Sequence, residues 1–537
     1  METARDFKNS FFYLTLAVVL FCIFWVYSST LSKNWSEDAI ANVCLVENAK
    51  NALSPSLYHP HHMFYHVSGF LFSRFVQIFL PQVLTITCLQ IFNSILAVFT
   101  IAVFFIGLRM LDIDRFISLC VSAGLAYTYT MWYCATSIEA RMSPLAFLLL
   151  CFIFIIKIEK VKFTYILVVA MGLCHALSIL LHQLSTLFAA VSIAGFFIFL
   201  KGKGRYKCLL LYIASTGFFT VTTYALIARY ILGVKGIKGF LLFVTSYMHL
   251  GTWGFDFFET LNIPRAAYGF LNAQLYLPLR TLKEFLKSSF SLMGLANTIA
   301  FIAVVSMLVL PLLSFRKTTN AINKQRIIFI GWIWIIFYLV LYVTTEAPQA
   351  QYVIVNYPFM VIPSWIMIAV CADNFSSMIN KRLVYLIAIM VPLYIFFWNY
   401  SFIITESTDI NNNLKFKNAV FWQRNSSPKT VFLSMDWEPY IEYFAKRRVV
   451  SIAKYFPDSE EDLEEANAQL YHLLDAELEN GNDIIMLDLD TAEHAQEYMS
   501  KLSKTYTFYN IKIFFSRYEL QPLSTEFGLA YKIKAKS

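Results

Sequence analysis

Charged side chains are scarce in this sequence. Asp, Glu, Lys and Arg make up 15% of its 537 residues, whereas hydrophobic residues make up 58%. Water-soluble domains carry roughly 25% charged residues, so this shortage excludes a water-exposed surface over most of the chain. Nearly all of the shortage lies before about residue 405. The composition therefore predicts a membrane part, residues 1–404, followed by a soluble domain, residues 405–537.

Other signatures are missing as well. The nine Cys residues lie mostly in apolar runs, and residues 405–537 contain none, so no disulfide framework or zinc spacing is visible. The soluble domain has no glycine-rich phosphate loop, which argues against a nucleotide site there. No internal repeat stands out, which counts against a transporter built from inverted repeats.

Apolar runs recur along the first 404 residues. A spanning helix needs about 20 mostly apolar residues, and roughly eleven runs approach that length. They are Phe11–Leu31, Val83–Leu108, Phe116–Ala135, Pro144–Ile158, Phe163–Leu181, Ser185–Leu200, Cys208–Leu232, Leu292–Leu313, Ile327–Thr345, Val353–Cys371 and Leu383–Ile404. Residues 429–537 alternate strand-like and helix-like segments. The predicted fold class is mainly α: a polytopic transmembrane helix bundle with a small C-terminal α/β domain.

Loop charge predicts the orientation of this bundle. From Glu406 onward there are 21 acidic and 15 basic residues, whereas the part before it is strongly basic. Lys and Arg gather in alternate short loops, which is typical of cytoplasmic loops rather than of nucleic-acid binding. These loops are 109–115, 157–162, 201–207, 314–326 and 372–382. With an odd number of spans, the N-terminus is then cytoplasmic and the C-terminal domain extracytoplasmic.

Acidic side chains are rare on the predicted extracytoplasmic face, which shortens the list of candidate general bases. Glu37 and Asp38 follow the first span directly. A carboxylate beside lipid is costly unless it is solvated or paired, so Asp38 is a catalytic candidate with Glu37 beside it. The alternative is that both cap the following helix.

Four of the nine His residues lie between His59 and His66. His62 and His66 are four positions apart and would share one face of an α-helix, where they could contact a phosphate. A metal site would need a third ligand that the spacing does not supply, so no metal ligand is assigned and a divalent metal ion stays an open alternative. Simple interfacial His residues are a further alternative.

Arg141 lies on the short turn before the fourth span, two residues after Glu139. Its planar donor fork suits phosphate, and Glu139 could orient it; the alternative is a surface ion pair. His182, at the outer end of the fifth predicted span, and His249, on the second long extracytoplasmic loop, are weaker supporting candidates together with His59.

In these features the sequence resembles the GT-C glycosyltransferases, the superfamily that includes protein O-mannosyltransferases and the lipid A aminoarabinose transferase. An acidic pair follows the first span, His59-Pro60 leads into an interfacial helix that ends near Phe79, and Glu-x-Arg-x-x-Pro-Leu-Ala opens the fourth span at 139–146. The acidic motif is more compact than in many members, which leaves open whether Glu37 or Asp38 acts.

This resemblance implies an integral membrane glycosyltransferase that uses a polyprenyl-phosphate sugar and a glycan, lipid or protein acceptor. Asp38 would remove the acceptor proton, and Arg141 with His62 or His66 would neutralise the leaving phosphate. Two alternatives remain open: a transporter or flippase of a lipid-linked or polar substrate, and a non-catalytic scaffold. The scarcity of charged residues inside the spans argues against ion-coupled transport.

Overall fold

The computed structural model describes residues 2–160, 164–249, 262–276, 322–345, 353–378, 380–435, 438–455, 463–487, 489 and 513–536. The chain forms two compact units. The first comprises Met1–Ser32, Leu45–Thr245 and Phe255–Thr408, and the second comprises Lys33–Cys44, Ser246–Gly254 and Asp409–Ser537.

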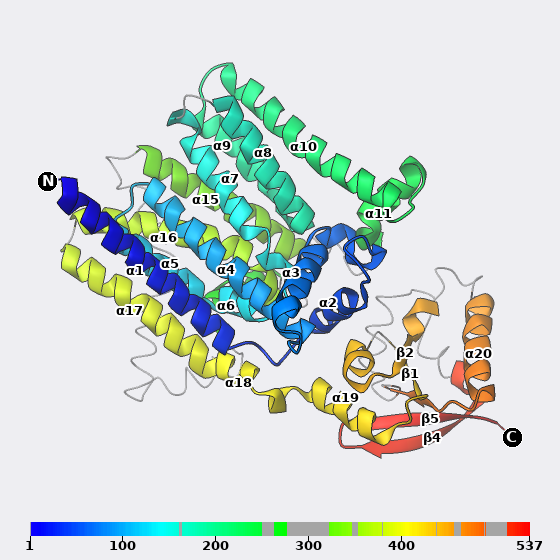
Figure 1. The fold of residues 1–537 in the computed structure, drawn as a ribbon. Coiled ribbons are helices and arrows are strands. Elements are labelled where there is room, and N and C mark those ends of the chain that lie inside the picture. Colours follow the sequence, from blue (N-terminus) through cyan, green and yellow to red (C-terminus); the bar gives the residue numbers. More distant parts are fainter. Residues whose placement is uncertain are drawn as a thin grey trace. The chain divides into compact units, whose positions relative to one another are not determined.

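The first unit is a bundle of α-helices, as the sequence predicts (Figure 1). Seven helical segments in the described part are long and apolar enough to cross a membrane, so the chain is a multi-pass integral membrane protein. The α-helices of this unit among the described residues are α1 (Glu2–Ser29), α3 (Tyr65–Phe79), α4 (Thr85–Met110), α5 (Arg115–Tyr127), α6 (Tyr129–Thr136), α7 (Leu145–Lys157), α8 (Thr164–Leu181), α9 (Phe188–Phe199), α10 (Gly204–Tyr230), α11 (Gly236–His249), α12 (Asn262–Gln274), α15 (Ile322–Thr345), α16 (Pro358–Met378), α17 (Lys381–Asn399) and α18 (Thr405–Thr408).

Two predicted spans depart from a single α-helix in the described residues, whereas α1 covers the first run up to Ser29. The run Ser185–Leu200 begins with a 3-10 turn before α9. The run Phe116–Ala135 is two helices, because the backbone leaves the helix at Thr128, whose hydroxyl donates to the carbonyl of Leu125. The predicted span Leu292–Leu313 lies outside the described residues.

Ion pairs join the predicted cytoplasmic loops at one end of the bundle. Asp373 accepts the backbone N–H of Asp114 at 2.9 Å and pairs with Lys324 at 2.7 Å. Arg326 pairs with Glu159 at 3.3 Å. These contacts connect four of the five basic loops, which is the arrangement that alternating spans require.

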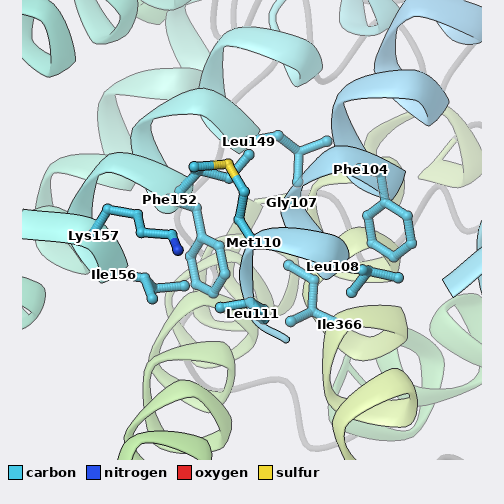
Figure 2. Close-up of a pocket in the computed structure, with 11 residues that line it drawn as sticks. Phe104, Gly107, Leu108, Met110, Leu111, Leu149, Phe152, Ile156, Lys157 and Ile366 are labelled. Carbon is cyan, nitrogen blue, oxygen red and sulfur yellow. The ribbon is translucent and has the colours of Figure 1, made fainter. Parts of the chain in front are cut away.

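A pocket near the same end is lined almost entirely by apolar side chains (Figure 2). Phe104 and Leu108 of α4 face Leu149 and Phe152 of α7, and Lys157 supplies the nitrogen at its border. No Asp, Glu or His of the described residues lines this pocket, so it lacks the side chains most often used in acid–base chemistry. The candidate chemistry lies at the opposite end of α7, around Arg141.

α3 carries large apolar side chains on both its buried face and its exposed face. Tyr65, His66 and Phe70 are buried on one face, whereas Phe75 and Phe79 on the other face are 60% and 69% exposed. Large apolar side chains on the exposed face suit the bilayer interface, as the sequence predicts for this helix.

The second unit contains a five-stranded sheet with strand order β2-β1-β3-β5-β4. Its strands are β1 (Val431–Ser434), β2 (Arg448–Ser451), β3 (Ile484–Met486), β4 (Tyr518–Thr525) and β5 (Gly528–Ala535). The first three strands pair in parallel, and β4 and β5 form an antiparallel hairpin at one edge. α19 (Leu414–Asn425) and α20 (Leu463–Glu479) complete the described α/β domain. The predicted fold class is therefore confirmed.

Lys33–Cys44, the segment that follows α1, belongs to this second unit. Trp35 stacks on Phe444 with ring centroids 5.5 Å apart and meets Phe416 edge-on at 6.3 Å. The hydroxyl of Tyr440 donates to the carbonyl of Trp35, and the amide of Asn413 donates to the carbonyl of Lys33 at 2.8 Å. Aromatic burial thus anchors the segment that carries the acidic pair to the C-terminal domain.

We predict that Trp35→Ala destabilises the second unit by about 3–5 kcal/mol, because a Trp that is 8% exposed leaves a cavity between Phe416 and Phe444. The measurement is the urea dependence of limited proteolysis within residues 409–537 of the full chain. Trp25→Ala is the matched control, since Trp25 is 65% exposed on α1. Equal resistance of both variants would contradict the anchoring role of Trp35.

Candidate functional site

Arg141 lies in a 3-10 turn (Ala140–Met142) between α6 and α7, and its guanidinium donates to the Glu139 carboxylate at 3.0 Å. The two side chains are 21% and 7% exposed, so water screens the pair only weakly. The predicted pairing is thus observed as a half-buried pair, not as a surface one. Such a pair fixes the orientation of the Arg141 guanidinium, whose planar arrangement of N–H donors suits an anion.

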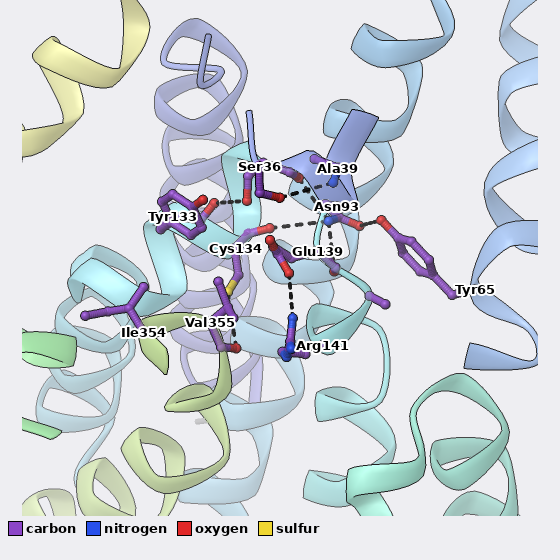
Figure 3. A network of polar contacts seen from close by, with 12 residues as sticks. Ser36, Ala39, Tyr65, Asn93, Tyr133, Cys134, Glu139, Arg141, Ile354 and Val355 are labelled. Carbon is purple, nitrogen blue, oxygen red and sulfur yellow. Dashed lines mark hydrogen bonds and ion pairs between the residues drawn. The ribbon is translucent and has the colours of Figure 1, made fainter. Parts of the chain in front are cut away.

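A buried amide holds the turn that carries this pair (Figure 3). The Asn93 side chain of α4 donates to the carbonyls of Ser137 and Glu139, each at 3.0 Å. Its carbonyl oxygen accepts the hydroxyl of Tyr65 from α3 at 3.3 Å. Because Asn93 is 0% exposed, breaking this network would leave polar groups buried without partners.

The His59–His66 segment begins as a 3-10 turn, η2 (Pro60–His62), and α3 starts only at Tyr65. His62 and His66 are therefore not on one continuous α-helix, although their ring centroids lie 5.8 Å apart. Pro60 fixes the first residue of the turn, and the His59 ring caps it by accepting the N–H of His61.

His182 joins this segment from the far end of α8. Its ring centroid lies 4.4 Å from that of His61 and 4.9 Å from that of His62. The backbone connects the same elements, because the N–H of Phe64 donates to the carbonyl of Leu180 at 2.9 Å. One nitrogen from each of His61, His62 and His182 lies within 4.8 Å of the others, so these three side chains could hold a metal ion.

These His side chains are neutral at pH 7. Burial lowers the pKa of His66 to about 3, and burial together with the positive Arg141 lowers that of His61 to about 3. Burial likewise lowers the pKa of His62 and of His182 well below the usual value, with neighbouring His side chains adding to the effect. Neutral imidazole can donate to a phosphate or bind a metal through its other nitrogen.

The two carboxylates of the acidic pair have different surroundings within the second unit. Glu37 and Asp38 form the first turn of α2 (Glu37–Asn48). Glu37 is in an ion pair with Lys415 of α19, whereas Asp38 is exposed and no described residue forms an ion pair with it. The helix N-terminus favours both carboxylates.

The structure thus brings together Arg141, Glu139 and the His cluster in the first unit, and places Glu37 and Asp38 in the second. His249 is the last residue of α11, and its side chain lies outside the described residues. Sequence analysis counted His61 in the His59–His66 cluster but assigned it no role. Its partners His182 and Gln183 are more than a hundred positions away, so no local spacing points to them.

Comparison with known proteins identifies the class of fold. No family model and no curated protein sequence matches this chain. Solved structures do match it, and they share with it the fold expected from the resemblance to GT-C glycosyltransferases.

The matching structures include ArnT and an archaeal oligosaccharyltransferase, each with a TM-score above 0.5. ArnT from Cupriavidus metallidurans, bound to undecaprenyl phosphate, has a TM-score of 0.58 and 9% identity, and the match covers 97% of each chain. The Archaeoglobus fulgidus oligosaccharyltransferase in its apo form has a TM-score of 0.53 and 11% identity, over 99% of this chain and 75% of that one. At these identities the likeness is one of fold.

We predict that stability falls as the pH drops below 6.5. The folded state keeps its buried His side chains neutral, whereas the unfolded state protonates them, so stability is complete above pH 6.5 and is lost on acidification. Below pH 6.5, each such His lowers the free energy of unfolding by about 1.4 kcal/mol per pH unit. Thermal unfolding of the detergent-solubilised protein between pH 7.5 and 5.5 measures this slope.

His66→Gln removes one of these groups and should flatten the pH slope. His472→Gln, an exposed residue of α20, should leave the slope unchanged. A transition temperature that is constant across this pH range in the unmodified protein would disprove the prediction.

Proposed function

We propose that this chain is a membrane glycosyltransferase that moves a sugar from a polyprenyl-phosphate donor to an acceptor hydroxyl on the extracytoplasmic face. The observation that carries the proposal is the fold match with ArnT over 97% of both chains, because that protein was solved with undecaprenyl phosphate bound. A lipid donor also gives a reason for the seven described helical segments that are long and apolar enough to cross a membrane.

Asp38 is proposed as the general base. It accepts the proton of the acceptor hydroxyl, whose oxygen attacks the anomeric carbon as the bond from that carbon to the phosphate oxygen breaks. Glu37 is already engaged by Lys415, whereas Asp38 is exposed at the helix N-terminus. This difference supports Asp38 over its neighbour, a choice that the sequence left open.

Arg141 is proposed as the main ligand of the donor phosphate, with His62 and His66 as neutral hydrogen-bond donors. Charge builds up on the phosphate oxygens as the sugar departs, and a fixed guanidinium stabilises that charge without reorganising. Glu139 holds the guanidinium at 3.0 Å, and the Asn93 network holds the backbone of Glu139. His59, which caps η2, has a supporting role.

We predict that Asp38→Asn lowers sugar transfer by about 10²–10⁴-fold, the usual contribution of a positioned general base. Radiolabelled polyprenyl-phosphate sugars added to membranes containing equal amounts of each variant measure this. Glu37→Gln is the matched neighbour and should retain most of the activity. Full transfer by Asp38→Asn would remove Asp38 as the base; no transfer by the unmodified protein from any donor would refute the transferase itself.

Arg141→Lys should keep the charge but lose the planar fork, and we expect transfer to fall by about 10²-fold. Arg74→Lys serves as the control, because Arg74 lies exposed on α3 over the ring of Phe70. The comparison uses kcat and KM for the lipid donor. Equal kinetics for the two Lys variants would show that Arg141 does not contact the phosphate.

A further inference from the structure

Three His side chains from two separate segments meet in the first unit. His61 and His62 come from η2, and His182 follows α8. His61 is 7% exposed and His182 is 0% exposed. Candidate ligand nitrogens within 4.8 Å of one another need to move together by only about 1 Å to surround an ion at 2.0–2.1 Å from each.

Gln183 sets the tautomer of His61. Its amide nitrogen lies 3.4 Å from the carbonyl oxygen of Val244 and 3.3 Å from the hydroxyl of Tyr224, which itself donates to the carbonyl of Pro60. The amide oxygen therefore faces His61 and accepts from Nδ1 at 3.3 Å. With the proton on Nδ1, the lone pair of His61 is on Nε2, which is how an outer hydrogen bond prepares an imidazole to bind a metal.

The other two rings carry buried nitrogens without a hydrogen-bond partner among the described residues. They are Nδ1 of His62 and Nε2 of His182. The Nδ1 of His182 accepts the N–H of Leu184 at 3.2 Å, so the metal-free ring carries its proton on the buried Nε2. Binding an ion at Nε2 moves that proton to Nδ1 and gives up the Leu184 contact, but it removes a buried donor that costs about 1–3 kcal/mol.

The charges around the cluster allow a divalent cation only when an anion accompanies it. The positive Arg141 is close enough to act on His61 and His182, and Glu139 compensates it at 3.0 Å. Three neutral imidazoles leave the charge of a divalent ion uncompensated, so its fourth position suits an anion or water. Imidazole ligands select Zn²⁺ and related ions over Mg²⁺, Ca²⁺ and Mn²⁺, which prefer oxygen.

We propose that His61, His62 and His182 form a three-histidine site for Zn²⁺ with an open fourth position. This site does not depend on the proposed sugar transfer, because zinc binding can be measured without a transfer assay. If both proposals hold, the ion replaces His62 as the direct ligand of a phosphate oxygen.

The test uses the full chain in detergent, stripped with a chelator and dialysed. Zn²⁺ is titrated by calorimetry, and Co²⁺ by its visible absorption, which is intense in four-coordinate sites. We expect one ion per chain and a loss of affinity of at least 100-fold in His182→Gln. His472→Gln, at an exposed position, should bind as the unmodified protein does.

Two further variants separate ligation from misfolding. Gln183→Leu leaves the three ligands in place but removes the bond to His61, so affinity should fall by about 10–100-fold. His182→Cys keeps a ligand of a different kind and should add a thiolate-to-cobalt absorption band to a protein that still binds. Failure of the unmodified protein to bind one equivalent, or unchanged binding by His182→Gln, would overturn the site while leaving the transferase proposal intact.

Discussion

Two buried amides of α4 hold the backbone where it leaves the helices of the membrane unit. Asn93 donates to the carbonyls of Ser137 and Glu139, and Gln90 donates to those of Ser32 and Thr136 at 2.7 and 2.8 Å. Irregular backbone within a bundle of this kind cannot rely on water, so its carbonyls need donors from the protein. The position of Arg141, and with it the candidate site, depends on these amides.

Polar groups in the membrane unit gather at two opposite ends with different roles. At one end, acidic and basic side chains such as Asp373 and Lys324 connect loops to one another. At the other, the buried His61 and His182 lie near Arg141, and Nε2 of His182 has no hydrogen-bond partner among the described residues. Satisfied ion pairs stabilise an arrangement, whereas buried polar atoms without partners indicate a ligand. This contrast distinguishes polar side chains that stabilise the fold from those that could bind a ligand.

The fold match and the local chemistry are two independent observations that support the same proposal. The match with ArnT covers nearly the whole of both chains, yet 9% identity transfers no residue role. The roles proposed for Asp38 and Arg141 rest on their own surroundings: an exposed carboxylate at a helix N-terminus and a guanidinium held by a buried partner. The assignments of Asp38 as general base and of Arg141 as phosphate ligand hold only if the chain catalyses the proposed sugar transfer.

Several features could be predicted from the sequence because they are local. Apolar length predicted the membrane helices, loop charge predicted which loops share an end, and Glu139-x-Arg141 predicted a pair before α7. Local signals were insufficient where the backbone departs from regular geometry. The break at Thr128 contains no proline, and the alternating strand-like and helix-like segments of residues 429–537 did not predict the edge hairpin of β4 and β5.

The sequence by itself thus determined a multi-span helical bundle, a C-terminal α/β domain and a short list of polar candidates, since hydrophobic length and residue type can be read directly. Tertiary structure decided which candidates meet. His182 joins His61 and His62 only because α8 packs against the η2 segment, and Lys415 engages Glu37 rather than Asp38 only because Trp35 stacks on Phe444. Contacts between distant residues depend on the packing of whole elements, which no local spacing encodes.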